Sequence, residues 1–408
     1  MPANEKQFLG GSGRQTCRVF EKILIHDIVR YCIKTYRTGV FKLGSIDDYR
    51  KQINDIDEEM AHLFEKRMQV CRSIAEYKKE KALPIKDATR ETELTKKSRS
   101  FISDREVEPY YISFLRNNIE LSCSYQSRII NGMKVAYSGV PGAYAHIAAK
   151  RMFPGAELIS FTNFEPAYHA AESGEVDCAV LPLENSYAGE VGAVMDLAFS
   201  GSLFINRVVG LEIEHNLLAN EGAGVDKIKT VVSHPQALQQ CDEYIKRHGF
   251  DTLEYSNTAR AAEYVKECGR DDVAAIASED TAELFGLKIL EKNINTAKNN
   301  TSRFGVFSRS QSVPNADTKD EQCSFLLVFT VPHKAGALAM MLDIIGAHGY
   351  NIDNLKSRPM KGLIWQYYFY LEIEGNINRR EGQDMLRELG AISDQLKLVG
   401  AYNSDVVI

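Results

Sequence analysis

The stretch NNTSRFGVFSR, residues 299–309, carries side chains that can do chemistry at the entrance of a strand. Amides and hydroxyls come first, and an Arg-Phe pair then leads into an alternating apolar run that predicts a β-strand. Asn and Ser are ordinary turn residues, but a turn does not need an Arg-Phe pair aimed into the next strand. Hydroxyls, a cation and an aromatic ring together therefore indicate a binding or catalytic site.

Two further polar segments come at the ends of predicted buried strands. PLENSYAGEV places Glu184, Asn185 and Ser186 after one strand, and SHPQALQQC places His234 and Gln236 ahead of a helix. Open α/β sheets bind ligands at the carboxyl ends of their strands. Helix capping would explain either segment alone, but the recurrence favours a shared site. The glycine-rich turn in YSGVPGAYAH also offers backbone N–H groups to an anion.

A second set of candidate residues lies on a long predicted helix. Arg67 and Lys78 are eleven residues apart, which is about 20° around a helix axis and about 16 Å along it, so both could hold one ligand. Arg50 lies about 25 Å beyond Arg67 and could join them only from a partner chain. Most single cations on a helix are simply solvated, but Arg67 and Lys78 neighbour the apolar stripe instead of opposing it.

These cations belong to a helical block, residues 45–130. Apolar residues recur at steps of three and four, and the first helix is predicted to end at Leu83-Pro84 because the residue before proline leaves the α region. A helix of that length is roughly 50 Å long, which suggests pairing with another chain. Asp87 is expected to cap a second helix, and YYISFLRNNIELSCSYQSRII predicts a third.

Two other blocks follow with different patterns. Residues 133–310 alternate short apolar strands with helices, which predicts parallel sheets covered by helices in two lobes. A polar linker leads to residues 323–402, whose strand-helix-strand-strand-helix-strand order predicts a ferredoxin-like α+β arrangement. Residues 1–44 form an extension to which the sequence assigns no function.

Composition bounds the function further. The chain has 408 residues, 44% of them apolar and 25% charged, which predicts two or three globular domains. A net charge of -6 gives no general affinity for nucleic acid. The eight cysteines are scattered singly, without metal-type spacing, which favours reduced thiols and a cytoplasmic protein. No apolar run is long enough to cross a membrane.

The helical block resembles the AroQ-type chorismate mutases, in the segment from DYRKQINDIDEEM to KDATRETEL and beyond. The resemblance implies an intertwined all-helical dimer that rearranges chorismate without nucleophile or cofactor. Two carboxylates would be held by Arg forks, while Lys78 and a protonated Glu91 or Gln126 would stabilise the charge on the breaking ether oxygen. The family's site residues correspond to Arg50, reaching into the partner's site, and to Arg67, Lys78, Asp87, Arg90, Glu91, Ser122 and Gln126, the last two after a one-residue gap.

Residues 133–310 resemble prephenate dehydratase domains, whose two lobes are like those of periplasmic binding proteins. The family motif N-x-[ST]-R-F is matched by Asn300, Ser302, Arg303 and Phe304, although the family more often has Thr at position 302. The resemblance implies that Ser302, or its neighbour Thr301, assists departure of hydroxide together with Asn185 and Gln236. Arg303 would hold a carboxylate, Phe304 would line the ring site with Ser186 nearby, and Glu184 or His234 would be the general acid.

Residues 323–402 resemble ACT domains, which sense small molecules and usually act as dimers. GALAMML matches the family's G-A-L turn with Gly336, Ala337 and Leu338. KSRP matches the E-S-R-P motif of the phenylalanine-binding variety at Ser357 and Arg358, with Lys356 in place of Glu. The resemblance implies phenylalanine as an effector; a dimerisation module without ligand is the alternative.

Together the three resemblances imply a fused chorismate mutase and prephenate dehydratase with phenylalanine feedback. Chorismate and prephenate would be its substrates, phenylpyruvate its product, and a homodimer or higher homo-oligomer its assembly, with no metal, cofactor, nucleic acid or membrane partner. Two alternatives remain: a non-catalytic two-lobed regulator, and a dehydratase with a degenerate mutase arm. A prephenate dehydrogenase is disfavoured because no strand precedes a G-x-G-x-x-G turn.

Overall fold

The computed structural model describes residues 45–187, 189–360, 367–403 and 406–408, so the extension at residues 1–44 lies outside the described residues. The chain forms two compact units, one up to Ile130 and one from Asn131 onward. Within the described ranges no helix is long and apolar enough to cross a membrane. The six cysteines in these ranges are all free thiols.

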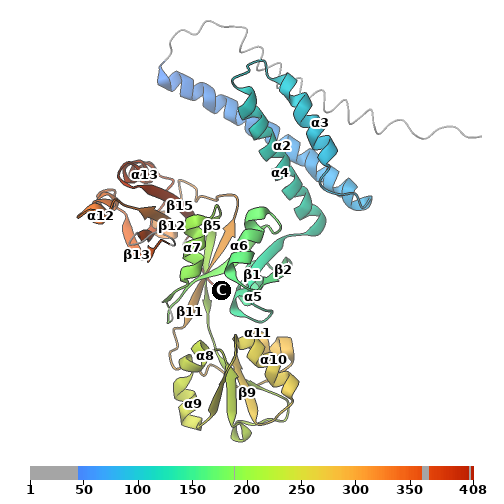
Figure 1. Cartoon of the computed structure of the whole chain (residues 1–408), viewed down its shortest axis with the longest axis vertical. Helices are drawn as coiled ribbons and strands as arrows, with labels where there is room; N and C mark the ends of the chain where they lie inside the picture. The colour runs from blue at the N-terminus through green and yellow to red at the C-terminus, as the bar shows by residue number, and fades with distance from the viewer. Residues whose placement is uncertain (1–44, 188, 361–366, 404–405) are drawn as a thin grey trace, which may run out of the picture. The chain divides into compact units, whose positions relative to one another are not determined.

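The first unit is helical, as the periodicity predicts (Figure 1). Ser45 caps the longest helix in a reciprocal arrangement with Asp48, each satisfying a backbone N–H of the other. The 35-residue helix stops before Pro84, and Asp87 caps the next helix as expected, accepting from the backbone N–H of Arg90 at 3.0 Å. The elements are α2 (Ile46–Glu80), α3 (Ala88–Ser98), the 3-10 turn η1 (Arg99–Phe101) and α4 (Glu108–Asn131).

The helical unit buries few of its apolar side chains. Cys71 and Ala75 are the buried residues of α2. Large apolar side chains on both long helices stay exposed: Ile46, Ile53, Ile56, Met60, Phe64, Val70, Tyr77, Tyr110, Phe114 and Leu121. A single copy of this unit therefore lacks the core that a stable domain of its size needs.

The second unit begins with a lobe built on a mixed sheet. Its strands are ordered β5-β11-β3-β1-β2, with helices packed on both faces. The elements are β1 (Lys134–Ser138), α5 (Tyr144–Met152), β2 (Glu157–Phe161), α6 (Phe164–Ser173), β3 (Cys178–Asn185), β4 (Gly189–Glu190), α7 (Gly192–Ser200), β5 (Phe204–Glu212) and, on the chain's return, β11 (Thr301–Ser308).

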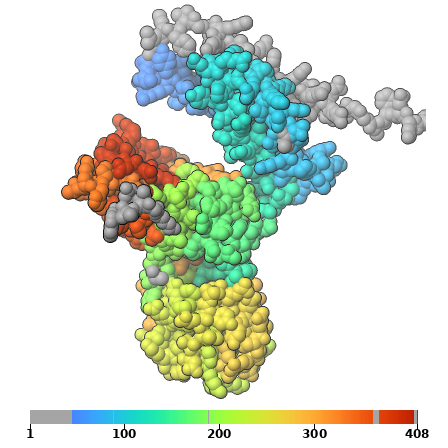
Figure 2. Space-filling model, viewed as in Figure 1, coloured from blue at the N-terminus to red at the C-terminus, as the bar shows by residue number. Residues whose placement is uncertain are grey.

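A second lobe is inserted between β5 and β11, and it appears as a body of its own, yellow in Figure 2. Its five-stranded sheet has the order β10-β6-β9-β7-β8. The elements are β6 (Asn216–Ala219), the 3-10 turn η2 (Val225–Lys227), β7 (Thr230–Ser233), α8 (Pro235–Gln240), α9 (Asp242–His248), β8 (Asp251–Glu254), α10 (Thr258–Cys268), β9 (Val273–Ala277), α11 (Glu279–Phe285) and β10 (Lys288–Glu291).

The prediction of two lobes is confirmed, but the prediction of parallel sheets is wrong in part. β1 pairs in parallel with β2 and β3, and β7 does so with β8 and β9. In contrast, β11 runs antiparallel to β3 and β5, and β6 runs antiparallel to β9 and β10. These strands enter or leave a lobe directly, without the helical crossover that a parallel pair requires.

The C-terminal segment has the predicted ferredoxin-like order. Its strands are arranged β13-β14-β12-β15, with α12 and α13 packed against each other. The elements are η3 (Asp320–Gln322), β12 (Cys323–Thr330), α12 (Ala337–Ala347), β13 (Asn351–Pro359), β14 (Tyr367–Glu374), α13 (Arg380–Ile392), β15 (Gln395–Asn403) and β16 (Val406–Val407). The first residues of the predicted strand before Tyr367 lie outside the described residues.

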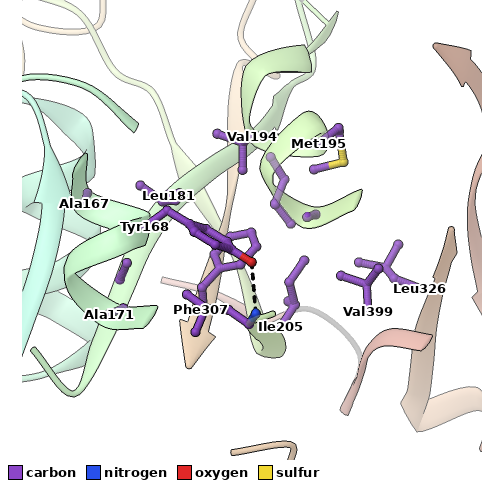
Figure 3. Close-up of a cluster of buried hydrophobic side chains, with 14 of the residues drawn as sticks. Ala167, Tyr168, Ala171, Leu181, Val194, Met195, Ile205, Phe307, Leu326 and Val399 are labelled. Carbon is purple, nitrogen blue, oxygen red and sulfur yellow. Dashed lines mark hydrogen bonds between the residues drawn. The ribbon is translucent and has the colours of Figure 1, made fainter. Parts of the chain in front are cut away.

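The C-terminal segment is joined to the first lobe by backbone and core. β15 pairs with β5 at Gly400 and Ile205, which makes one eleven-stranded sheet. Figure 3 shows the shared core, in which Leu326 and Val399 face Val194, Met195 and Ile205. In the same cluster the backbone N–H of Leu203 donates to the Tyr168 hydroxyl at 2.9 Å, the dashed line of the figure.

Gly400 tests this junction, because a Cβ there would overlap the carbonyl oxygen of Ile205. We expect Gly400→Ala to lower the free energy of unfolding of the second unit by about 1–3 kcal/mol, the usual cost of overpacking. Urea unfolding followed by circular dichroism measures this. Gly346→Ala is the control: it lies in α12 with open space around it and should be neutral or slightly stabilising. Equal effects of the two variants would contradict the close approach.

Candidate active sites

In the helical unit, the structure brings Arg67 of α2 to Ser122 of α4. A guanidinium nitrogen of Arg67 donates to Ser122 Oγ, and Ser122 in turn donates to the carbonyl of Asn118 at 2.6 Å. Asn118, Ser122 and Gln126 are spaced by four residues and buried on one face of α4. Among the described residues no group hydrogen-bonds Gln126 Oε1, although this atom is buried. An unsatisfied buried acceptor costs about 1–3 kcal/mol, which a ligand donor would recover.

Lys78 and Glu91 lie near the same part of α4. Both act on the thiol of Cys123, whose pKa is raised mainly by burial, with Glu91 raising it further and Lys78 lowering it. Lys78 Nζ donates to the carbonyl of Ile85 at 2.6 Å, in the turn before α3. Arg50 does not join this group: its exposed side chain pairs with Asp47 at 3.3 Å, and it lies nearly five helical turns, about 25 Å, from Arg67 along α2.

In the second unit, the antiparallel pairing of β3 with β11 sets Ser302 directly opposite Asn185. Asn185 Nδ2 donates to Ser302 Oγ at 2.9 Å and to Asn300 Oδ1 at 2.8 Å. Asn185 Oδ1 accepts from the backbone N–H of Tyr187 at 3.0 Å and from Gln236 Nε2 at 3.4 Å. The predicted set of Asn185, Gln236 and Ser302 is therefore gathered, with Gln236 coming from the second lobe.

His234 and Ser186 border this group. His234 caps α8, and its Nδ1 accepts the backbone N–H of Gln236 at 3.3 Å. Burial lowers the pKa of His234, so its ring is neutral at pH 7 and offers Nε2–H as a donor. Ser186 accepts the backbone N–H of Thr301 at 2.9 Å and donates to the carbonyl of Asn299 at 3.0 Å, which fixes the segment before β11.

Glu184 and Arg303 do not reach this group, contrary to the expected catalytic roles. Side chains alternate between the two faces of a strand, so these neighbours of Asn185 and Ser302 point to the opposite face. Arg303 there bonds Glu184 at 2.8 Å and also Glu372 of β14, whose carboxylate accepts at 2.5 and 2.8 Å. Burial alone would raise the pKa of Glu372, but its bonds with Arg303 hold the pKa below the usual value.

Two neighbouring expectations need the same correction. Thr301 shares a face with Arg303, so the hydroxyl that meets Asn185 is that of Ser302. Phe304 is 2% exposed and packs in the core with Tyr137 and Ile147, so it does not line a ring site.

The glycine-rich turn before α5 also differs from expectation. Its backbone N–H groups are already bonded within the protein: Gly139 to Phe161, Ala143 to Val140, and Gly142 to the His146 ring at 3.2 Å. The turn therefore does not present these groups to an anion. Thr281 of α11 donates to the Gly142 carbonyl at 2.9 Å, which ties the turn to the second lobe.

Sequence reasoning missed three residues that stand behind Asn185. Tyr144, His215 and Gln240 form a hydrogen-bonded series that ends at Asn300. His215 is 1% exposed, and burial lowers its pKa to about 4, partly offset by the bond to Gln240. The only sequence signal was a His between two apolar strands, in EIEHNLLA.

The two predicted effector motifs of the C-terminal segment lie at the start of α12 and on β13. Gly336 has φ +80° ahead of Ala337 and Leu338 at the start of α12, a left-handed conformation that favours glycine. Ser357 is exposed on one face of β13. Lys356 and Arg358 point to the other face, where Lys356 lies 3.6 Å from both Glu184 and Glu190. Arg358 contacts Glu190 at 3.2 Å and Asp196 at 3.0 Å, and the Asp196 bond raises its pKa.

Comparisons with known proteins match both units. The family model for chorismate mutase type II matches residues 49–127, and the model for prephenate dehydratase matches residues 135–312. A bifunctional chorismate mutase/prephenate dehydratase of Escherichia coli (strain K12) is 30% identical over 380 residues, covering 88% of this chain and 96% of that protein.

Solved structures match the second unit. A prephenate dehydratase from Arthrobacter aurescens in complex with L-Phe gives a TM-score of 0.61 at 27% identity, covering 67% of this chain and 90% of that one. A structure described as a novel type of quorum-quenching acylase gives 0.62 at 32% identity, covering 66% and 98% of the two chains. The same fold therefore occurs in proteins described with different activities, so the activity must be argued from the site.

The lowered pKa of His215 predicts a loss of stability in acid. Below about pH 6.5 the unfolded chain takes up a proton that folded His215 refuses until about pH 4, so stability is lost across that window as the pH falls. By pH 5 the loss is about 2 kcal/mol. Urea unfolding at pH 7 and pH 5 should show a smaller difference in His215→Gln than in the wild type. An identical difference would mean that His215 takes up a proton in the folded protein.

Proposed function

The chain belongs to the family of bifunctional chorismate mutase/prephenate dehydratases, and we propose that it converts chorismate to prephenate and prephenate to phenylpyruvate, on the route to phenylalanine. Both family models match, and the E. coli enzyme is covered almost end to end. The observation that carries the dehydratase assignment is the Asn185–Ser302 pair on facing strands with Gln236 against it.

In the mutase reaction, an ether C–O bond breaks while a C–C bond forms within one molecule. The protein has to hold the compact conformer and stabilise negative charge on the ether oxygen. We assign one substrate carboxylate to Arg67, which Ser122 holds in place. Gln126, through its amide Nε2, and Lys78 are the donors for the ether oxygen, with Glu91 beside them. Asp87 and Arg90 position the start of α3 around the site.

In the dehydratase reaction, the ring carboxylate leaves as carbon dioxide, its electron pair aromatises the ring, and hydroxide leaves from the opposite carbon. Hydroxide needs a proton as it departs. Ser302 Oγ already accepts a bond from Asn185, so its own hydrogen can be donated to the departing oxygen. Gln236 and the neutral ring of His234 are the further donors at this position. Arg303 is assigned to the contact with the C-terminal segment and not to the substrate.

The exposed apolar side chains of α2 and α4 support a homodimer formed through the helical unit. Pairing two copies would cover these side chains, and Arg50 of one copy would then reach the site of the other. A higher oligomer through the C-terminal segments is compatible with this arrangement. The cytoplasmic location stays a prediction from the scattered cysteines.

We further propose phenylalanine feedback through the C-terminal segment. The relative from A. aurescens was solved with L-Phe. In this chain β13 and β14 contact the back of the catalytic strands: Lys356 pairs with Glu184, next to Asn185, and Glu372 pairs with Arg303, next to Ser302. A shift of β13 on effector binding would therefore pull on the residues that flank the catalytic pair. Lys356, which departs from the family motif, is part of this contact.

Separate sites predict reciprocal loss of the two activities. Arg67→Ala should lower the chorismate mutase rate by about 100-fold or more and leave the dehydratase rate unchanged, because only the mutase site loses its carboxylate ligand. Ser302→Ala should do the reverse by a similar factor. Phenylpyruvate formation from chorismate and, separately, from prephenate measures both.

Conservative replacements are the matched controls for that experiment. Ser302→Thr restores the family's usual residue and should keep most of the dehydratase rate, since the hydroxyl remains. Thr301→Ala should be close to the wild type because its side chain faces away from Asn185. Loss of both activities in Arg67→Ala, or an unchanged rate on prephenate in Ser302→Ala, would contradict these assignments.

Feedback predicts that the effector response can be changed without changing catalysis. Lys356→Met removes the contacts to Glu184 and Glu190, and Ser357→Ala alters the exposed motif face; each should raise the phenylalanine concentration for half-inhibition several-fold while the KM for prephenate stays near the wild-type value. Arg380→Met, at a side chain that is 90% exposed, is the control. Inhibition curves that overlay for all three variants would place the effector site elsewhere.

A further inference from the structure

An unbroken series of hydrogen bonds runs from α5 to the catalytic hydroxyl. The Tyr144 hydroxyl lies 3.0 Å from His215 Nδ1, and His215 Nε2 lies 2.8 Å from Gln240 Oε1. Asn300 Nδ2 donates to the same Gln240 oxygen at 2.9 Å, and Asn300 Oδ1 accepts from Asn185, the partner of Ser302. His215, Gln240 and Asn300 are all buried.

One backbone group fixes the direction of every bond in this series. The N–H of Tyr187 can only donate, so the atom of Asn185 that it meets is the oxygen. Asn185 Nδ2 must then face Asn300 and Ser302, which requires the oxygen of Asn300 toward Asn185 and its nitrogen toward Gln240. Gln240 therefore presents its oxygen to both Asn300 and His215.

His215 must consequently carry its hydrogen on Nε2 and leave Nδ1 as the acceptor for the Tyr144 hydroxyl. The neutral ring that this requires agrees with its burial. Gln240 bears a cost for this orientation: among the described residues, no acceptor pairs with its buried Nε2. If the Gln240 amide were rotated, its Nε2 would face the Nδ2 of Asn300, and two donors would then be set against each other. The series therefore keeps this direction although the unpaired Nε2 of Gln240 costs about 1–3 kcal/mol.

We propose that His215 and Gln240 are positioning residues for the dehydratase reaction, which hold Asn300 and Asn185 so that Ser302 receives a hydrogen bond and keeps its own hydrogen for the departing oxygen. The inference rests on the proposed dehydratase function. Without the N–H of His215 donating to Gln240 Oε1, the amides of Gln240 and then Asn300 are free to turn, and Asn185 Nδ2 would then face the nitrogen of Asn300 instead of its oxygen. The catalytic hydroxyl would lose its fixed orientation while the substrate-binding surface stays as it is.

The same residues stand where the chain passes between the lobes. His215 lies between β5 and β6, Asn300 lies just before β11, and Gln240 ends α8 of the second lobe. The backbone repeats the link, because the N–H of Ile294 donates to the His215 carbonyl and that of Thr296 to the Gln240 carbonyl. The ordered series thus couples the second lobe, which also carries Gln236, to the catalytic pair of the first lobe.

Two substitutions at one position separate positioning from packing. His215→Gln keeps an N–H donor where Nε2 lies, and His215→Leu has a similar volume without a donor. We expect His215→Leu to lower kcat for prephenate by about 10- to 100-fold with KM within about 2-fold, and His215→Gln to recover most of kcat. Urea unfolding of the same full-length preparations, followed by circular dichroism, reports on folding of the second unit, whereas mutase activity checks only the separate helical unit.

A double-mutant cycle with Gln240→Met completes the experiment. If the two residues act in one series, the double variant His215→Leu/Gln240→Met should lose no more kcat than the worse single variant. Multiplying losses, equal loss in His215→Gln and His215→Leu, or a rise in KM without loss of kcat would each overturn the proposal. A wild-type protein that makes no phenylpyruvate from prephenate would instead refute the dehydratase function itself, so the two failures are distinguishable.

Discussion

The antiparallel pairing of β3 with β11 is the constraint on which the second unit depends. It sets Asn185 against Ser302 and, one residue along, Glu184 against Arg303. Because side chains alternate across a strand, the first pair faces Gln236 of the second lobe, and the second pair faces the C-terminal segment. Two adjacent residues on each strand therefore serve two different surfaces. Any movement that shifts one strand against the other must disturb both.

The second surface is a cluster of charges in which Glu372 is buried, whereas Arg303 and Glu184 stay partly exposed. Arg303 is shared between Glu184 and Glu372, and Tyr402 donates to Glu372 at 2.8 Å. Removing charges from water is costly, so such a cluster adds less to stability than its contacts suggest, whereas removing one member leaves an uncompensated charge. The cluster is better understood as a device for specific docking. It selects one alignment of the C-terminal strands on β3 and β11, which the proposed phenylalanine feedback would require.

The two units solve the problem of a core in different ways. The second unit buries continuous apolar clusters, one of which combines residues of the first lobe with Leu326 and Val399 of the C-terminal segment (Figure 3). The helical unit leaves apolar side chains of α2 and α4 exposed, and its buried groups on α4 are largely polar. The proposed homodimer would cover these side chains and would bring in Arg50 of the second copy, since Arg50 is too far along α2 to act within its own chain.

The sequence by itself determined the order of the elements and the family motifs. Periodicity, the proline at 84 and the cap at Asp87 predicted the helices closely, because those signals act within a few residues. The strand-helix order of residues 323–402 was determined in the same local way. Motif spacing also identified Asn185, Gln236 and Ser302 as one group, which the structure brings together.

Only the tertiary structure decided which face each motif residue serves. Glu184 and Arg303 are adjacent to Asn185 and Ser302 in sequence, and Phe304 is two residues from Ser302, yet strand alternation and burial send them to other surroundings. His215 is marked in the sequence only by its place between two apolar strands, and Gln240 carries no local signal, since a buried His or Gln acquires its role from partners distant in sequence. The direction of their hydrogen bonds follows from one backbone N–H at Tyr187, and such a relation exists only once the strands and both lobes have come together.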